Sequence, residues 1–272
     1  MSALKTRTAP ALDRALTLLE LLSQSRNGLT LPELAAQASL PRSSVHYLLV
    51  TLERRGYLHR NPRTSRYLFG RQVIALANAA LPSLGIRQQA GPLLQRLATQ
   101  TGLTAHLAVF ERDSAVVVAK HEASQSPRLP TWVGRRISLH SSSLGKAILA
   151  FLPAEELDEL LAAHPLARYN QHTLATPRRL REDLARVAAV GHAFDNEEEE
   201  LGMRCVGAPI WTPASESASA VVASVSVSGA IDSITLDRVD ELARLVKNTA
   251  AALATVVDTA DLPLSAQRAR VD

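Results

Sequence analysis

Residues 41–55 carry the hydrophobic pattern of an amphipathic helix. Their apolar positions recur at the spacing of three and four residues that lines one helix face: Val45, Leu48, Leu49 and Leu52. Pro41 fits the first turn of such a helix, where its missing N–H costs nothing. The other face carries polar, basic and aromatic side chains that crowd toward the N-terminal end: Arg42, Ser43, Ser44, His46, Tyr47 and Thr51. A recognition helix that puts its first residues into the DNA major groove needs this arrangement.

The segments before this helix complete a helix-turn-helix pattern. Residues 32–38 predict a short helix, and a tight turn at residues 39–40 joins it to the recognition helix. Residues 12–22 repeat leucine and alanine at helical spacing, so a third helix can close a small core. Asn27 and Gly28 supply the break between the first two helices.

Residues 56–69 predict a β-hairpin behind the recognition helix. Residues 56–60 and 66–69 alternate briefly between apolar and polar side chains, and residues 61–64 form a turn. Three arginines of this hairpin are predicted to hold phosphates or a minor groove, as a wing does: Arg60, Arg63 and Arg66. A helix-turn-helix pattern alone also recurs in unrelated alanine-rich proteins, but three helices followed by a basic hairpin are much more specific.

The pattern after residue 70 predicts a second domain that mixes helices and strands. Helices are expected at residues 71–81, 87–100, 145–151, 154–163, 178–190 and 236–257. Alternating or β-rich runs predict strands at residues 104–110, 115–121, 137–139, 192–195, 205–211 and 218–228. Antiparallel strands with helices at the two ends make an α+β domain, in which one face of the sheet is free to form a pocket.

Charge separates the two predicted domains. Residues 1–80 hold 11 Lys and Arg against 4 Asp and Glu, whereas residues 81–272 hold 19 against 22. This local excess suits a DNA-binding module attached to a near-neutral domain. A solvated basic face without a partner would give the same balance, so the charge supports the helix-turn-helix interpretation without deciding it.

Composition narrows the class of protein. The 272 residues are enough for two domains, each with its own core. No apolar run approaches the ~18 residues of a membrane span, and the first ten residues lack the apolar segment of a signal peptide. Cys205 is the single cysteine, so by itself it forms neither an internal disulfide nor a cysteine-based zinc site. The prediction is a cytoplasmic protein with no cofactor, metal or membrane partner.

Three fragments resemble enzymatic motifs without completing one. Ser143 and Lys146 fit Ser-x-x-Lys, but the chain has no Ser-Asp-Asn and no Lys-Thr-Gly. Gly145 and Lys146 resemble the end of a phosphate loop that lacks its leading glycine and its Ser or Thr. Cys205 could be a nucleophile with a histidine base, yet a lone cysteine on an apolar strand is more often a small buried hydrophobe. No catalytic residue is predicted.

Four segments resemble the isocitrate lyase regulator (IclR) family of bacterial transcription factors, and together they span nearly the whole chain. They are ALDRALTLLELL (11–22), LPELAAQASLPRSSVHYLLVTLERRGYL (31–58), LHSSSLGKAILAFLP (139–153) and GHAFDNEEEELGMRCVGAPI (191–210). The resemblance implies a winged helix-turn-helix at residues 1–70, a linker helix at 71–85 and a GAF-like effector-binding domain at 86–259. The sequence itself predicts a disordered tail at 260–272. It also implies a homodimer, or a tetramer of two dimers.

Seven positions match the effector pocket of that family: Leu129, Ile137, Ser143, Leu144, Asp195, Met203 and Cys205. The resemblance implies an apolar wall, two polar positions at Asp195 and Cys205, and backbone amides at Ser143 and Leu144 that favour a carboxylate. Asp195 would repel that carboxylate, so we expect it to accept a hydrogen bond at the opposite end. The expected effector is a small hydroxy, keto or aromatic acid. Trp132 could stack on an aromatic one, although an isolated tryptophan more often packs against other residues of the protein.

The acidic run at residues 197–200 is predicted to have a structural role, because by the same resemblance its first two members lie beside the pocket. Two functions therefore stay open. The favoured one is a regulator that binds a double-stranded DNA operator under the control of a small effector. The alternative is a small-molecule sensor whose basic module contacts another protein and has no operator.

Overall fold

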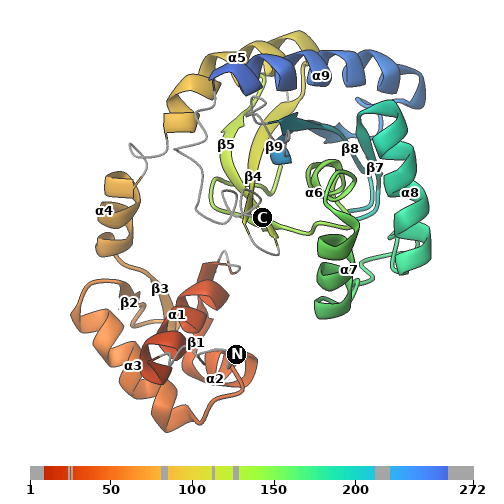
Figure 1. Ribbon diagram of the computed structural model, residues 1–272. Helices are drawn as coiled ribbons and strands as arrows, with labels where there is room; N and C mark the ends of the chain where they lie inside the picture. The colour runs from red at the N-terminus through yellow and green to blue at the C-terminus, as the bar shows by residue number, and fades with distance from the viewer. Residues whose placement is uncertain are drawn as a thin grey trace, which may run out of the picture. The chain divides into compact units, whose positions relative to one another are not determined.

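The computed structural model describes residues 9–23, 25, 27–80, 85–111, 114–124, 129–211 and 221–256 (Figure 1). These fall into two compact units, Met1–Ser83 and Leu84–Asp272. The predicted tail at 260–272 lies outside the described residues. None of the helices in the described ranges is long and apolar enough to cross a membrane.

The N-terminal unit has the predicted three helices and hairpin. The helices are α1 (Pro10–Ser23), α2 (Leu31–Gln37) and α3 (Arg42–Arg54), and the hairpin strands are β2 (Leu58–Arg60) and β3 (Arg66–Phe69). A two-residue strand, β1 (Leu29–Thr30), joins them in an antiparallel sheet of order β1-β3-β2. The sequence did not predict β1, because two residues are too few to alternate. Helix α4 (Arg71–Ala80) follows the wing.

The predicted stripe of α3 faces the core of this unit. Val45 and Leu49 are fully buried, and Leu48 and Leu52 pack against the same cluster. Helix α1 behaves differently from the expectation. Leu18 and Leu22 are buried, but Leu12 is 61% exposed and Leu16 is 49% exposed, so the N-terminal half of α1 contributes an apolar surface instead of core.

A capping box starts α2 and ties it to the wing. The Thr30 hydroxyl accepts from the Glu33 amide, and a Glu33 carboxylate oxygen accepts from the Thr30 amide at 2.7 Å. The Arg66 guanidinium of β3 then pairs with Glu33 at 3.2 Å and donates to the Gly28 carbonyl at 2.7 Å. The wing is therefore fixed to the start of the helix-turn-helix.

The C-terminal unit is the predicted α+β domain. Six antiparallel strands lie in the order β6-β5-β4-β9-β8-β7. They are β4 (Thr104–Glu111), β5 (Ser114–His121), β6 (Arg136–Ile137), β7 (Ala193–Asn196), β8 (Met203–Trp211) and β9 (Val221–Ala230). The helices are α5 (Gly85–Thr101), α6 (Ser143–Leu149), α7 (Ala154–Ala163), α8 (Pro177–Val190) and α9 (Val239–Val256). The last helix is preceded by a 3-10 turn, Leu236–Arg238, which the sequence reading had merged with it.

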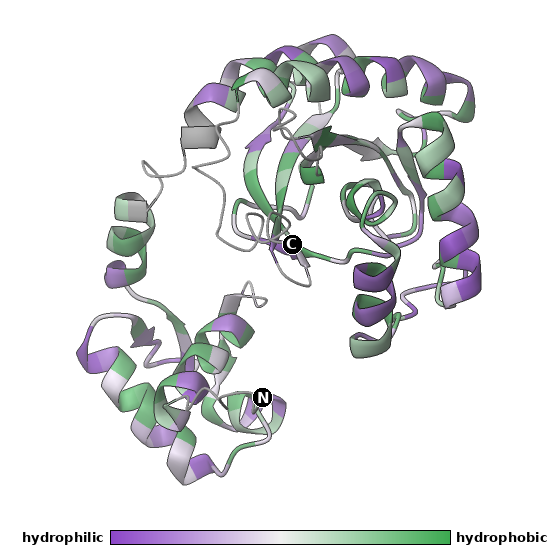
Figure 2. Ribbon diagram, in the orientation of Figure 1, coloured by the Kyte–Doolittle hydropathy of each residue, from purple (hydrophilic) through white to green (hydrophobic). Residues whose placement is uncertain are grey.

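Strand β9 shows how the sheet separates its two faces. Val225 and Val227 are fully buried in the core cluster that includes residues of α5 and α9. Those two helices run side by side along the sheet in Figure 1, and in Figure 2 hydrophobic and hydrophilic residues alternate along both, as one buried face requires. Ser226 and Ser228 alternate with the valines and line a cavity on the other face. Helix α6 packs on that second face.

Candidate functional site

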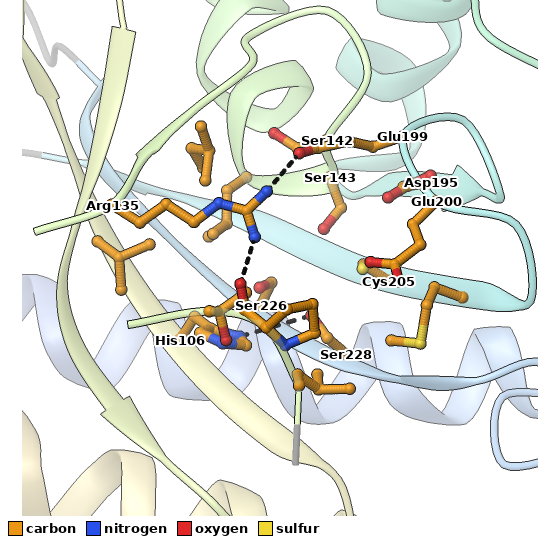
Figure 3. Close-up of a pocket in the computed structure, with 17 residues that line it drawn as sticks. His106, Arg135, Ser142, Ser143, Asp195, Glu199, Glu200, Cys205, Ser226 and Ser228 are labelled. Carbon is orange, nitrogen blue, oxygen red and sulfur yellow. Dashed lines mark hydrogen bonds and ion pairs between the residues drawn. The ribbon is translucent and has the colours of Figure 1, made fainter. Parts of the chain in front are cut away.

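A cavity of about 80 Å³ lies on the α6 side of the sheet (Figure 3). All seven residues predicted for the effector pocket line it: Leu129, Ile137, Ser143, Leu144, Asp195, Met203 and Cys205. Leu129 and Cys205 are 76 residues apart in the sequence, and the fold brings them to the same cavity. A single water needs about 10–15 Å³ of such space, and the cavity therefore suits a small molecule.

Two glycines let α6 lie against the sheet at this cavity. A Cβ on Gly207 of β8 would come within 2.8 Å of the Ser143 carbonyl oxygen, and a Cβ on Gly145 would come within 2.3 Å of the Leu139 Cα. Glycine is needed at such close approaches of backbone. The N-cap of α6 is Ser142, whose hydroxyl accepts from the Gly145 amide at 3.0 Å. The start of α6 thus forms one wall of the cavity.

Asp195 and Cys205 face each other across neighbouring strands. They are register partners of β7 and β8. Asp195 is buried, and its Oδ1 accepts from the Glu198 amide at 2.9 Å. Burial raises the pKa of Asp195 to about 7, helped by the Glu198 carboxylate, so this acid can carry a proton near neutral pH. Burial and Asp195 raise the pKa of the Cys205 thiol well above its usual value, which argues against a thiolate nucleophile.

The sequence reading missed the polar floor of the cavity. His106 of β4 is buried, contacts the Thr131 hydroxyl through Nε2 at 2.8 Å and lies 3.5 Å from the Ser228 hydroxyl through Nδ1. Burial, together with the nearby charges of Lys120 and Arg135, lowers the pKa of His106 to about 3, so the ring is neutral. Ser226 is buried and its hydroxyl has no hydrogen-bond partner among the described residues. The alternation of valine and serine along residues 224–228 could have predicted that these serines lie on the face of the sheet opposite the core.

Arg135 was also missed, because it lies in a loop without a motif. Its guanidinium donates to the Pro130 carbonyl at 2.8 Å and to the Glu199 carboxylate at 2.8 Å, and it points across the cavity in Figure 3. Both Arg135 and Glu199 line the cavity. The pair joins positions 64 residues apart.

Trp132 and the acidic run at 197–200 were both expected near the cavity. Trp132 does not line the cavity; its ring lies 5.6 Å from the Arg135 guanidinium carbon, so it stacks on that arginine. In the acidic run, Glu199 and Glu200 line the cavity, and Glu198 lies beside it, where its amide donates to Asp195. Sequence position could not separate these four acids, because the turn between β7 and β8 sets which of them point inward.

Lys146 has a structural place instead of an enzymatic one. Its fully buried ammonium contacts the Glu198 carboxylate at 2.5 Å, the Asp183 carboxylate at 2.9 Å and the Phe194 carbonyl at 2.6 Å. This cluster links α6, α8 and the end of β7. A Ser-x-x-Lys site would need a neutral lysine amine as its base, whereas the two carboxylates favour the charged ammonium of Lys146. The motif fragment is therefore explained by the packing of the domain.

The predicted DNA-contacting residues of α3 lie on its solvent side. Arg42, Ser43, His46, Tyr47 and Thr51 are exposed, Tyr47 to 73%, and Ser44 is half-buried. The Thr51 hydroxyl donates to the Tyr47 carbonyl within the helix. The exposed face therefore begins with the first residue of α3, on the side opposite its buried stripe.

The three wing arginines differ in their exposure to solvent and in the contacts of their guanidinium groups. Arg63 is exposed at the tip. Arg60 is exposed, donates to the Ser65 hydroxyl at 2.9 Å and lies 5.9 Å from the Tyr67 ring centre. Arg66 is different, because Glu33 and Gly28 engage its guanidinium. This engagement favours a role for Arg66 in holding the wing.

Comparisons with known proteins match both units. Residues 11–62 match the family model described as IclR helix-turn-helix domain, and residues 78–255 match the one described as Bacterial transcriptional regulator IclR C-terminal. The transcriptional repressor IclR of Escherichia coli (strain K12) is 34% identical over 247 residues, which cover 88% of this chain and 89% of that protein. The regulator BhcR of Paracoccus denitrificans is 39% identical over 219 residues, with 80% and 77% covered.

A solved structure shares the fold. It is an IclR homologue from Microbacterium hydrocarbonoxydans complexed with 4-hydroxybenzoate, and it superimposes with a TM-score of 0.72 at 24% identity. The match covers 91% of this chain and 98% of that one.

Proposed function

The chain belongs to the IclR family of bacterial transcriptional regulators, and from this premise we propose that a small organic acid in the C-terminal cavity controls how the N-terminal unit binds its operator. It is a DNA-binding regulator and not an enzyme. The observation that carries the proposal is the cavity itself, because the seven residues matched to the family pocket all line it.

The proposed operator contacts follow from exposure and charge. The base-reading residues are proposed to be Arg42, Ser43, Ser44, His46, Tyr47 and Thr51. Arg60 and Arg63 are proposed to hold phosphates or a minor groove, because both are exposed on the wing. Arg66 supports the wing from inside through its pair with Glu33. By analogy with the relative named a repressor, the proposed action is repression.

The proposed effector is a small hydroxy, keto or aromatic acid. It would contact the seven matched residues: Leu129, Ile137, Ser143, Leu144, Asp195, Met203 and Cys205. The unpartnered hydroxyl of Ser226 supports a ligand with a polar group, since a buried hydroxyl without a partner costs free energy. The 4-hydroxybenzoate in the homologue's structure supports the aromatic member of the class.

The proposed assembly is a cytoplasmic homodimer, or a tetramer of dimers, with a DNA-binding domain at residues 1–70, a linker helix at 71–85 and an effector-binding domain at 86–259. Exposed apolar residues support pairing through the N-terminal unit and the linker. Leu12 and Leu16 lie on α1, and Ile74 and Leu76, which are 62% and 50% exposed, lie on α4.

Selection from a random double-stranded DNA library tests the operator. At ~150 mM salt, nonspecific phosphate binding is weak, so the purified chain should enrich a pseudo-palindrome with half-sites about one helical turn apart or a multiple of it. Binding to the enriched DNA is then measured with pyruvate, lactate or 4-hydroxybenzoate added, and at least one of them should change the affinity.

The double variant Asp195→Ala with Cys205→Leu is the control for the cavity. It should keep its DNA affinity and its oligomeric state but lose the response to the acid. A library without an enriched sequence would favour the alternative, a sensor whose basic module contacts another protein. An unchanged response in the double variant would put the effector outside this cavity.

A further inference from the structure

The charges around the cavity pose a problem for an acidic ligand. Among the described residues that line it, Arg135 is the one permanent cation, against the carboxyl groups of Asp195, Glu199 and Glu200. A carboxylate that entered without a cationic partner would be repelled and desolvated. The backbone amides of Ser143 and Leu144 can donate to a carboxylate, since the Ser142 hydroxyl caps the Gly145 amide instead, but these amides carry no net charge to offset the acids. An anionic ligand therefore needs Arg135.

Arg135 is held in place independently of Glu199. One end of its guanidinium donates to the Pro130 carbonyl at 2.8 Å, and its central carbon lies 5.6 Å from the centre of the Trp132 ring. Its own carbonyl accepts from the Val117 amide of β5 at 3.0 Å. Because these contacts do not involve Glu199, the guanidinium keeps its position when the Glu199 carboxylate leaves. A preorganised guanidinium is the group best suited to bind a carboxylate.

Glu199 accepts from the second terminal nitrogen of the Arg135 guanidinium. Its carboxylate accepts from Nη2 at 2.8 Å, and each of the two side chains is about one quarter exposed. Burial raises the pKa of Glu199 although Arg135 favours its charged form. Glu199 is thus a carboxylate of the protein that sits where the carboxylate of a ligand would bind.

The turn that carries Glu199 is anchored on both sides of it. Before it, the Glu198 amide donates to Asp195 at 2.9 Å and the Thr173 hydroxyl donates to the Glu198 carbonyl at 2.7 Å. After it, the Gly202 amide donates to the Glu197 carboxylate at 2.8 Å. The side chain of Glu199 can therefore swing away from Arg135 without unfolding the turn.

The ion pair also connects opposite edges of the sheet. Arg135 directly precedes β6, which is one edge strand, and Glu199 follows β7, which is the other. A ligand that separates Arg135 from Glu199 exchanges a direct bond between these edges for one that runs through the ligand. Binding is then coupled to a change at the sheet edges.

We infer that the carboxylate of the effector replaces the Glu199 carboxylate on Arg135, so that Arg135 selects anionic ligands and Glu199 is a built-in competitor that limits their affinity. This inference rests on the proposed function, that the cavity binds a small organic acid. At the far end of the ligand, a hydroxyl or keto oxygen meets Ser226, whose hydroxyl lacks a partner in the described chain, and Asp195.

Matched acids and amides test the need for charge. Calorimetric titrations of the full-length protein use pyruvate, lactate and 4-hydroxybenzoate, each beside its uncharged amide. At least one acid should bind, and its amide should bind weaker by roughly tenfold or more, since each tenfold is about 1.4 kcal/mol. An amide that binds as tightly as its acid would overturn the role of Arg135.

Removing the competitor is the sharper test, because a gain of affinity cannot come from a damaged fold. Glu199→Gln should bind the acid more tightly, by on the order of tenfold. The matched control Glu200→Gln removes the same charge one residue further along the turn but leaves the Arg135–Glu199 pair intact, so its gain should be clearly smaller. Arg135→Gln should lose the preference for the acid over the amide.

The outcomes separate this inference from the proposed function. If acids bind and change operator affinity, but Glu199→Gln binds them no more tightly than wild type or Glu200→Gln gives an equal gain, the competition is disproved while the function stands. If none of the acids binds or changes operator affinity, both fail. Tighter binding in Glu199→Gln alone supports the exchange on Arg135.

Discussion

The recognition surface of α3 and the cavity beside α6 both depend on charged side chains, but they hold them in opposite surroundings. Around α3 and the wing, Arg42 and Arg63 are exposed to solvent. Around the cavity, Asp195 and Lys146 are buried, and Glu198 with them. Exposed charges interact weakly, at about 0.2–1 kcal/mol per pair, whereas a buried charge that loses its partner costs several kcal/mol.

This difference in burial determines how substitutions act in each region. Exposed arginines can be exchanged one at a time with nearly additive effects, which suits a surface that reads DNA base by base. Buried carboxyl groups are coupled to each other and to their cations, so a ligand that changes one contact changes several. We therefore expect substitutions at the cavity to alter stability, pH dependence and ligand binding together, and substitutions at α3 to alter DNA binding alone.

The largest expected effect comes from Lys146→Met. The substitution removes the ammonium that the Glu198 and Asp183 carboxylates share. Glu198 is then buried without its cation, whereas the partly buried Asp183 keeps Arg186. Breaking a buried pair in this way costs about 3–5 kcal/mol. Urea unfolding followed by circular dichroism should show that loss in the free energy of unfolding of the C-terminal unit.

Lys247→Met is the matched control for this experiment. Lys247 is exposed and donates to the Val190 carbonyl at 3.2 Å, so the same chemical change should cost less than about 1 kcal/mol. Equal losses in the two variants would mean that burial does not distinguish the cavity region from the surface.

Sequence reasoning described these two regions unequally for a physical reason. The buried stripe of α3 depends on local periodicity, and Val45 and Leu49 are buried as that periodicity predicts. The resemblance to the family supplied the seven pocket positions, which alternation along single strands could not have assembled. Contacts between distant loops stayed hidden: Lys146 to Glu198 spans 52 residues and Arg135 to Glu199 spans 64. Neither pair has a local pattern, because only the folded sheet brings its members together.

A smaller effect is expected at the recognition surface. Arg42→Ala should lower the affinity for the selected operator by about 1–3 kcal/mol if its guanidinium makes a bidentate base contact, with affinity for random DNA changed much less. Fluorescence anisotropy with both DNAs over a range of salt concentrations measures this discrimination.

Arg63→Ala provides the contrast on the wing. A lost phosphate contact should weaken operator and random DNA about equally and reduce the salt dependence by about one ion. Operator binding by Arg42→Ala that matches wild type would mean that the first turn of α3 does not read bases.

The smallest expected effect is a pH dependence that only the cavity can produce. Burial raises the pKa of Asp195 to about 7, so the neutral acid dominates below that pH and the carboxylate above it. Ionised Asp195 repels an acidic ligand, and affinity should therefore fall as pH rises through 7, by at most tenfold per unit, or about 1.4 kcal/mol. His106 stays neutral over this range because its pKa is near 3, the Cys205 thiol stays protonated because its pKa is raised, and Arg135 stays charged.

Glu199 also has a raised pKa, so Asp195→Asn is the deciding comparison. Titrating the bound acid at pH 6, 7 and 8 should give a decline in wild type that Asp195→Asn largely removes, and DNA binding without ligand should change equally with pH in both proteins. A decline that persists in Asp195→Asn would assign the proton to Glu199 instead, and the cavity would then sense pH through the same carboxylate that competes for Arg135.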